Sequence, residues 1–281
     1  MPDSYPCNVY AWFLSTSNSV STSTSYATKI AEGPSNTVTV SPEKTYYYFC
    51  VVTNPAYPQL TLYSAPKQVS TPFSGRDRAA LVAIYNACGG ANWSNQTNWN
   101  TDADISTWSG VSVTQGRVTS LNLYNRGLTG NLPEELGNLT ELVSLSLYTN
   151  QITGLPESIG NLTKLVTLEL QTNKLTQLPN GLGQLAALNS LNVSSNLLTQ
   201  LPNTIGGLSK LTSLNLSYNQ LESLPVGLQQ LTSLTSFNVS RNLLKTDLPS
   251  LRTALTKLTS FNVTYNNLNF SNLVASGFVG G

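Results

Sequence analysis

The sequence predicts an α/β solenoid with a parallel sheet, preceded by a helical cap and a small all-β domain. A pattern of the form L-x-x-L-x-L-x-x-N-x-L returns seven times, at spacings of 23 or 24 residues, between residues 118 and 268. Residues 74–90 carry apolar side chains at helical spacing, and residues 1–73 alternate apolar and polar ones. The expected parts are a β domain over 1–73, a cap over 74–117, seven repeats over 118–270 and a tail over 271–281.

Residues 1–73 are predicted to form a small β-sandwich-like domain. The stretches "CNVYAWFL", "TVTVS", "TYYYFCVV" and "QLTLYSAPKQV" have the period of two that strands require, which indicates four or five antiparallel strands. "YAWFLSTSNS" followed by "TYYYFCVVTN" resembles the middle and late strands of bacterial immunoglobulin-like domains. Cys7 and Cys50 would then lie on neighbouring strands, so we expect a disulfide between them in an oxidising compartment. Cys88 is expected to be free and buried in the cap.

The cap is predicted to begin with a helix over "SGRDRAALVAIYNACGG" (74–90). Ser74 is expected to cap the helix, Asp77 lies three residues later, and the Gly-Gly pair at 89–90 ends it. The apolar residues that share one face are Ala80, Leu81, Ile84 and Tyr85. Three tryptophans follow in the cap: Trp93, Trp99 and Trp108. We interpret them as a core that seals the end of the solenoid, rather than as a sugar-binding platform.

The repeats are expected to stack as parallel strands. In "LTSLNLSYN", Leu214 and Leu216 would face inward, and Ser213, Asn215 and Ser217 would face outward, because strand side chains alternate between faces. Each repeat would then contact only its neighbours. The seven copies begin at Val118, Leu142, Leu165, Leu188, Leu211, Leu234 and Leu258.

The returning segments, such as "LPESIGNLTKL" (155–165) and "LPNTIGGLSKL" (201–211), complete the pattern. Over residues 118–268 the chain resembles the leucine-rich repeat family, in the LPxxIGxLxxL form of bacterial surface proteins and plant receptor ectodomains. The resemblance implies a right-handed horseshoe with a concave parallel sheet. It also implies a buried ladder of side chains that bond the backbone of adjacent turns: Asn150, Asn173, Asn196, Asn219, Asn242 and Asn266. Arg126 occupies the first rung.

Residues 76–116 resemble the N-terminal cap of these ectodomains. That cap usually carries a cysteine pair, whereas Ser106 and Val113 stand in those places here. We therefore expect this cap to be held together by aromatic packing.

The outward strand positions form three columns of uncharged polar side chains. Neighbouring members should lie about 4.8 Å apart, which makes a surface roughly 30 Å long. The first column is Ser120, Ser144, Thr167, Ser190, Ser213, Ser236 and Ser260. The central column is Asn122, Ser146, Glu169, Asn192, Asn215, Asn238 and Asn262. The third column is Tyr124, Tyr148, Gln171, Ser194, Ser217, Ser240 and Thr264. Nine N-x-S/T triplets occur, four of them in the central column, and we interpret them as a by-product of the repeat.

The concave face is predicted to bind a protein or glycan ligand outside the cell. Tyrosine and arginine often anchor interfaces, and the face carries both among its polar residues. The candidate ligand-binding residues are Asn122, Tyr124, Tyr148, Glu169, Gln171, Asn192, Asn215, Tyr218, Asn238, Arg241, Asn262 and Tyr265. Two alternatives stay open: binding to ice or another lattice through the periodic array, and a purely structural spacer with a solvated face.

Composition excludes several other classes. The chain has 14 Lys and Arg against 13 Asp and Glu, so no basic surface for nucleic acid is expected. Histidine is absent and there are three cysteines, so we predict no metal site, no cofactor and no catalytic residue. Glu169 is the lone acid expected on the concave face, while Glu134, Glu135, Glu141 and Glu157 are interpreted as solvated.

The predicted location is extracellular or at the cell surface. The composition, rich in Ser, Thr and Asn, favours this, although the first ten residues lack the features of a secretory signal. No stretch is long and apolar enough for membrane insertion. The oligomeric state is left open, with pairing through an uncapped C-terminal repeat as one alternative.

Overall fold

The computed structural model describes residues 9–15, 28–32, 45–54, 57–63, 67–70, 74–245 and 251–269. The chain divides into two compact units, Met1–Gly75 and Arg76–Gly281. The expected tail over 271–281 lies outside the described residues.

The first unit contains five strands in one antiparallel sheet, in which β3 pairs with β1, β4 and β5. The strands are β1 (Val9–Ser15), β2 (Thr28–Glu32), β3 (Thr45–Asn54), β4 (Tyr57–Tyr63) and β5 (Lys67–Ser70). Cys50 lies opposite Trp12 in the register of β1 and β3, whereas its predicted disulfide partner Cys7 lies outside the described residues. The immunoglobulin-like identity of this sheet stays a prediction.

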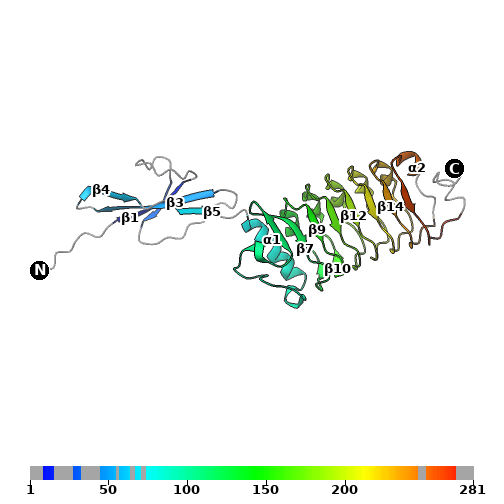
Figure 1. The fold of residues 1–281 in the computed structure, drawn as a ribbon, viewed down its shortest axis with the longest axis horizontal. Coiled ribbons are helices and arrows are strands. Elements are labelled where there is room, and N and C mark those ends of the chain that lie inside the picture. The colour runs from blue at the N-terminus through cyan, green and yellow to red at the C-terminus, as the bar shows by residue number, and fades with distance from the viewer. Residues whose placement is uncertain are drawn as a thin grey trace. The chain divides into compact units, whose positions relative to one another are not determined.

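The second unit begins with helix α1 (Ser74–Ala87), which covers the first end of the repeat stack (Figure 1). Leu81 and Ile84 are fully buried in the same core as the leucines of the repeats. After α1 come two short 3-10 helices and a strand: η2 (Gly90–Asn92), η3 (Ile105–Thr107) and β6 (Val111–Thr114).

The three tryptophans of the cap form a buried aromatic cluster. The ring centroid of Trp99 lies 5.0 Å from that of Trp93 and 5.1 Å from that of Trp108. Each indole N–H donates a hydrogen bond to a backbone carbonyl within the cap, so the polar edge of each ring is satisfied. The cluster thus packs the cap, and none of its three rings is exposed to a sugar.

Asp77 ties the cap helix to the first strand of the repeats. Its side chain is fully buried and accepts hydrogen bonds from Arg117 Nε at 3.1 Å and from the Val118 N–H at 2.7 Å. The sequence pattern suggested a local role at the start of α1, but these partners lie about 40 residues away along the chain. A buried ion pair with a backbone bond fixes the angle at which helix and sheet meet.

The seven strands of the repeats and β6 of the cap form a sheet of eight strands in the order β15-β14-β13-β12-β11-β9-β7-β6. All neighbours are parallel except β6 and β7, which form a hairpin whose turn residues Gln115 and Gly116 have φ values of 50° and 77°. The predicted solenoid with a parallel sheet is confirmed. Its further strands are β7 (Arg117–Asn122), β9 (Ser144–Ser146), β11 (Thr167–Glu169), β12 (Ser190–Asn192), β13 (Ser213–Asn215), β14 (Ser236–Asn238) and β15 (Ser260–Asn262).

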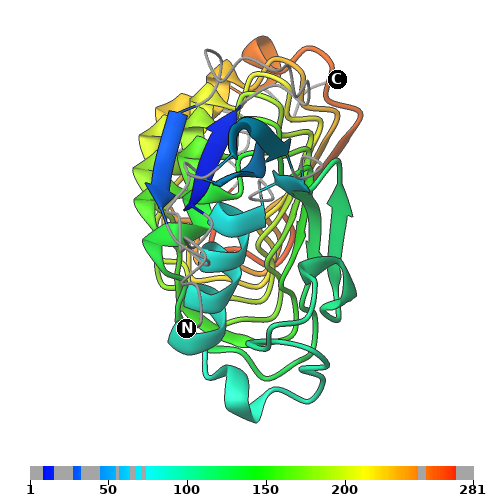
Figure 2. The ribbon, with the colours of Figure 1, turned by 90° about the vertical axis from the view of Figure 1, so that its left-hand side faces the viewer.

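The side opposite the sheet is made of short helices, and Figure 2 shows successive turns lying one behind another. A Cβ placed on Gly160 would lie 2.6 Å from the carbonyl oxygen of Gly181, so glycine at this position lets neighbouring helices approach closely. The helices are η4 (Glu134–Asn138), η5 (Glu157–Asn161), η6 (Asn180–Gln184), η7 (Asn203–Gly207), η8 (Val226–Gln230) and α2 (Leu251–Ala254). A second parallel sheet joins β8 (Thr129–Asn131) to β10 (Gln151–Gly154).

A ladder of asparagines links each repeat to the one before it. Asn196 Oδ1 accepts from the Leu175 N–H at 3.0 Å, and Asn196 Nδ2 donates to the carbonyl oxygens of Leu170 and Val193 at 3.0 and 3.1 Å. Equivalent bonds are made by the other residues of the ladder: Asn150, Asn173, Asn219, Asn242 and Asn266. Buried backbone groups at the end of every strand are thereby satisfied.

Arg126 occupies the first rung and bonds the cap in place of an earlier repeat. Its guanidinium donates to the carbonyl oxygens of Asn95 and Ser109 at 2.8 and 2.9 Å. Burial lowers the pKa of this guanidinium from its ordinary value. The long side chain therefore reaches across to the cap, where asparagine would be too short.

Replacing one rung should weaken the whole solenoid. Asn196→Ala leaves the buried Leu175 N–H without a partner and leaves the Leu170 carbonyl with only the bond from Asn173, which should lower the free energy of unfolding by about 1–3 kcal/mol. Urea denaturation followed by circular dichroism measures this loss. Asn161→Ala is the matched control, because Asn161 is the exposed last residue of η5, and it should change the free energy by less than about 0.5 kcal/mol. Equal losses in the two variants would contradict the ladder's role.

Cys88 should be inert in the folded protein. Burial raises the pKa of its thiol from 9.0 to about 12, so the thiolate is scarce below that pH. Because the pKa is higher in the folded state, stability from the protonated thiol is complete below pH 9 and declines as the pH rises from about 9 to 12. Iodoacetamide labelling at pH 8, with mass spectrometry of the Cys88 peptide, should show labelling only after urea is added. The Cys88→Ala variant should lose less stability than the wild type across this pH range.

Candidate functional site

The outward side chains of the seven parallel strands lie in register on one face, called the strand face below. Thr167 pairs with Ser190 and Glu169 with Asn192, and the same alignment continues strand by strand to β15. This register brings side chains separated by 23 or 24 residues into neighbouring positions about 4.8 Å apart. The strand face is the surface that was expected to be concave.

Asparagines of the central column accept hydrogen bonds from third-column residues of their own repeat. Asn192 Oδ1 accepts from the backbone N–H and the hydroxyl of Ser194, at 3.1 and 2.8 Å. The same arrangement joins Asn215 to Ser217 and Asn262 to Thr264. The N-x-S/T spacing therefore has a structural use, because the amide oxygen holds the turn that follows the strand. The amide Nδ2 groups are left as the donors of the column.

Three serines expected to face outward are buried. Ser146, Ser217 and Ser240 have exposed fractions of only 6%, 5% and 6%. The Ser146 hydroxyl donates to Glu169 Oε2 at 2.8 Å, and the Ser217 hydroxyl donates to Asn215 Oδ1 at the same distance. Small side chains at these positions are covered by the longer neighbours that they bond. The strand face thus presents fewer free hydroxyls than the sequence pattern suggested.

The cap-proximal end of the strand face carries two stacked tyrosines. The rings of Tyr124 and Tyr148 are 4.9 Å apart and inclined by 16°, and Tyr124 is 47% exposed. Next along the third column is Gln171, whose Oε1 is buried and has no hydrogen-bond partner. Together with Glu169, these residues place an aromatic surface beside hydrogen-bond acceptors.

A further column follows the third, at the residue before each ladder position. Every member adopts positive φ, between 50° and 59°, so the backbone directs these side chains to one rim of the strand face whatever their type. The members are Asn125, Thr149, Thr172, Ser195, Tyr218, Arg241 and Tyr265. The repeat pattern located these residues, but it carried no signal of their backbone conformation.

Three of these residues form a stack at the C-terminal end, called the rim cluster below. The Cζ atom of Arg241 lies 5.0 Å from the ring centroid of Tyr218 and 4.2 Å from that of Tyr265. Both rings are well exposed, at 53% and 71%. Exposed cation–π contacts contribute about 0.5–1 kcal/mol each, so the stack holds the guanidinium in a defined place.

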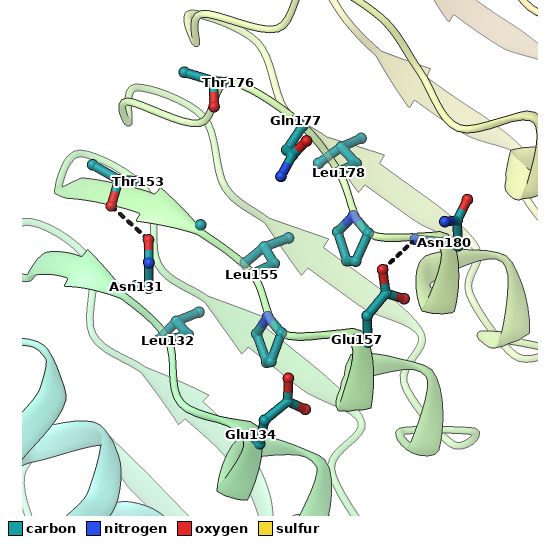
Figure 3. Close-up of a pocket in the computed structure, with 13 residues that line it drawn as sticks. Asn131, Leu132, Glu134, Thr153, Leu155, Glu157, Thr176, Gln177, Leu178 and Asn180 are labelled. Atoms are coloured by element: carbon teal, nitrogen blue, oxygen red, sulfur yellow. Dashed lines mark hydrogen bonds between the residues drawn. The ribbon is translucent and has the colours of Figure 1, made fainter.

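The flank of the solenoid contains a hollow of about 590 Å³ between β8, β10 and the short helices (Figure 3). Glu157 in this hollow accepts from the N–H groups of Asn180 and Gly181 at 3.1 and 2.7 Å, and Glu134 accepts from that of Ser158 at 3.1 Å. The carboxylates thus bond the first turn of the next helix while they stay exposed, so a structural role is added to the solvated position expected from the sequence.

The described residues contain no group of three or more His, Cys, Asp or Glu side chains that could hold a metal ion. Within the same residues, no helix combines the length and apolar character needed to cross a membrane.

Comparison with known families identifies the repeats. The family model described as "Leucine-rich repeat region" matches residues 118–197, and the one described as "Leucine rich repeat" matches residues 186–244.

Individual proteins also match part of the chain. The chain is 38% identical over 97 residues, 34% of its length, to "Probable inactive receptor kinase At1g48480" of Arabidopsis thaliana, of which it covers 14%. It resembles the solved ectodomain of the plant membrane receptor kinase GASSHO1/SCHENGEN3 from Arabidopsis thaliana in complex with CASPARIAN STRIP INTEGRITY FACTOR 2. That match has a TM-score of 0.51 and 39% identity, and covers 53% of this chain and 19% of that one.

A third match is the crystal structure of PEPR1–AtPEP1, with a TM-score of 0.52 and 27% identity over 68% of this chain and 32% of that one. The chain therefore spans less than a third of the length of each of these three relatives. The family matches and the stacked turns agree on the same residues: residues 118–244 form leucine-rich repeats.

Proposed function

We propose that the chain is an extracellular, non-enzymatic recognition module that binds a protein ligand on its strand face. The observation that carries this proposal is the presence of exposed, rigidly stacked tyrosines at both ends of a sheet whose remaining outward residues are almost uncharged. Aromatic side chains held in place lose little entropy on binding, and they are typical anchors of protein interfaces.

The comparisons support the choice of a protein ligand. Among these relatives, the GASSHO1/SCHENGEN3 ectodomain was itself solved in complex with CASPARIAN STRIP INTEGRITY FACTOR 2. The chain shares its fold and 39% of the aligned residues with it, so binding through the same kind of surface is the simplest extension. An extracellular location follows by the same extension, because that relative is an ectodomain.

Contacts on the strand face favour recognition over lattice binding. An ordered lattice surface needs hydroxyls and amides that are free to hold water, whereas the hydroxyls of Ser194, Ser217 and Thr264 donate to asparagines of the same repeat. The candidate residues of the proposed site are Asn122, Tyr124, Tyr148, Glu169, Gln171, Asn192, Asn215, Tyr218, Asn238, Arg241, Asn262 and Tyr265.

Blocking the strand face should abolish ligand binding. Peptides are first selected from a phage-displayed random library on the immobilised full chain. The double variant Ser213→Arg with Ser236→Arg places two long cations at the paired fifth and sixth positions of the first column, where both serines are half-buried. The dissociation constant of the selected peptides, measured by calorimetry, should rise at least about tenfold, since an interface loses its contacts when bulky charge is inserted.

The matched control adds the same two charges elsewhere. Ser209→Arg with Thr232→Arg alters exposed residues that follow η7 and η8, and binding should stay within about twofold of the wild type. Equal effects of the two double variants would place the binding surface outside the strand face. A glycan array and a thermal hysteresis measurement address the other ligand classes: binding there, with no peptide selected, would overturn the proposal.

A second prediction concerns the tyrosine stack. Tyr124→Ala removes a ring that is almost half exposed and rests on Tyr148, so it should weaken peptide binding by about tenfold or more while lowering unfolding stability by about 1 kcal/mol. Calorimetry and urea denaturation measure the two effects. Tyr124→Phe keeps the ring and should bind within about threefold of the wild type; a loss equal to that of alanine would show that the hydroxyl, not the stacked ring, makes the contact.

A further inference from the structure

The rim cluster leaves the N–H donors of the Arg241 guanidinium available for hydrogen bonding. The guanidinium Cζ atom lies over both tyrosine rings, 5.0 Å from the centroid of Tyr218 and 4.2 Å from that of Tyr265. A guanidinium carries five N–H donors in its plane, and stacking on its faces does not engage them. Among the described residues, Arg241 makes no side-chain hydrogen bond and no ion pair.

No acid of the strand face is placed to neutralise this cation. Glu169 is the only carboxylate in the described part of the three strand columns and the rim, and it lies three strands away, about 14 Å along the stack. The residues next to Arg241 in the columns are uncharged, among them Ser240, Asn238 and Thr264. A planar cation with free donor edges therefore stands alone on a neutral surface.

Carboxylate is the chemistry that fits this arrangement. The in-plane edges of a guanidinium match the two oxygens of a carboxylate, which can accept two parallel hydrogen bonds. The two rings cover part of the cation, and this partial shielding from water strengthens such a bond compared with an unshielded arginine. Tyr218 and Tyr265 also supply apolar area on which the rest of an acidic residue can pack.

We propose that the rim cluster binds the carboxylate of an Asp or Glu side chain of the protein ligand, with Arg241 as the anion contact and Tyr218 and Tyr265 as its supports. This proposal rests on the proposed function, since it names one chemical feature of the ligand of the strand face. It also gives the ligand a direction: its acidic residue lies at the C-terminal end of the repeat stack, away from Tyr124 and Tyr148.

The anion contact can be tested without the ligand. The full chain, labelled with 15N, is titrated with N-acetyl-glutamate N-methylamide, and the arginine Nε–H signals are followed by NMR. The signal of Arg241, assigned by its absence in Arg241→Lys, should shift with concentration, whereas that of Arg126, which bonds the cap, should not. The uncharged N-acetyl-glutamine N-methylamide should leave both signals in place. The absence of a shift, or an equal shift of both signals, would overturn the proposal.

The same contact should appear in the ligand. Peptides selected from the phage-displayed random library on the wild type should be enriched in Asp and Glu, and those selected on Arg241→Gln should not be. The selected acidic peptides should bind Arg241→Gln between about tenfold and a hundredfold more weakly, as expected for the loss of a charged hydrogen bond. Arg241→Lys keeps the charge but loses the planar fork, and should recover only part of this affinity.

The control variant Lys174→Gln removes one positive charge from a residue outside the rim, where Lys174 bonds Gln151, and it should bind acidic peptides like the wild type. Selected peptides without acidic enrichment, or equal weakening by Arg241→Gln and Lys174→Gln, would overturn the carboxylate contact and leave the proposed function standing. If no peptide binds the wild type at all, the proposed function itself fails, and the carboxylate contact fails with it.

Discussion

The structure depends on the hydrogen bonds that one asparagine in each repeat after the first makes to the backbone of its own turn and of the turn before it. A strand of three residues cannot satisfy the polar groups of the chain that leaves it, and water does not reach those groups. The amide supplies a donor and an acceptor at once, which no apolar residue and no single hydroxyl could do in this geometry. The leucines provide the buried area, while the asparagines set the spacing between turns.

That fixed spacing is what converts a repeated sequence into an ordered surface. Because each turn is tied to its predecessor, side chains at equivalent positions line up on the strand face and along the rim. The N-terminal end of the stack is held by other contacts. There, the guanidinium of Arg126 and the carboxylate of Asp77 join the first turn to the tryptophan-packed cap. Function then depends on which few positions depart from the uniform pattern.

Much of this was predictable from the period of the sequence, and the exceptions have identifiable causes. The leucine core, the parallel sheet and the positions of Tyr218, Arg241 and Tyr265 follow from alternation and register. The Asp77–Arg117 pair was not predictable, because it joins segments with no repeat relation. The burial of Ser217 was missed because alternation assigns a face but does not reveal that a neighbouring Asn215 will cover a small side chain. The stacking in the rim cluster depends on a left-handed turn that leaves no mark in the sequence.

At the rim, the left-handed turn forms whatever the residue type, so the side chains there can serve recognition without being required for folding. In all seven repeats the backbone there takes the same conformation, although the residue is Asn, Thr, Ser, Tyr or Arg. The side chain at this site therefore contributes little to folding. Substitution there should lower the free energy of unfolding less than substitution in the strands. A combinatorial library randomised at these seven codons would vary a line of side chains about 29 Å long on an unchanged scaffold, which makes the rim a natural starting point for engineered binding proteins.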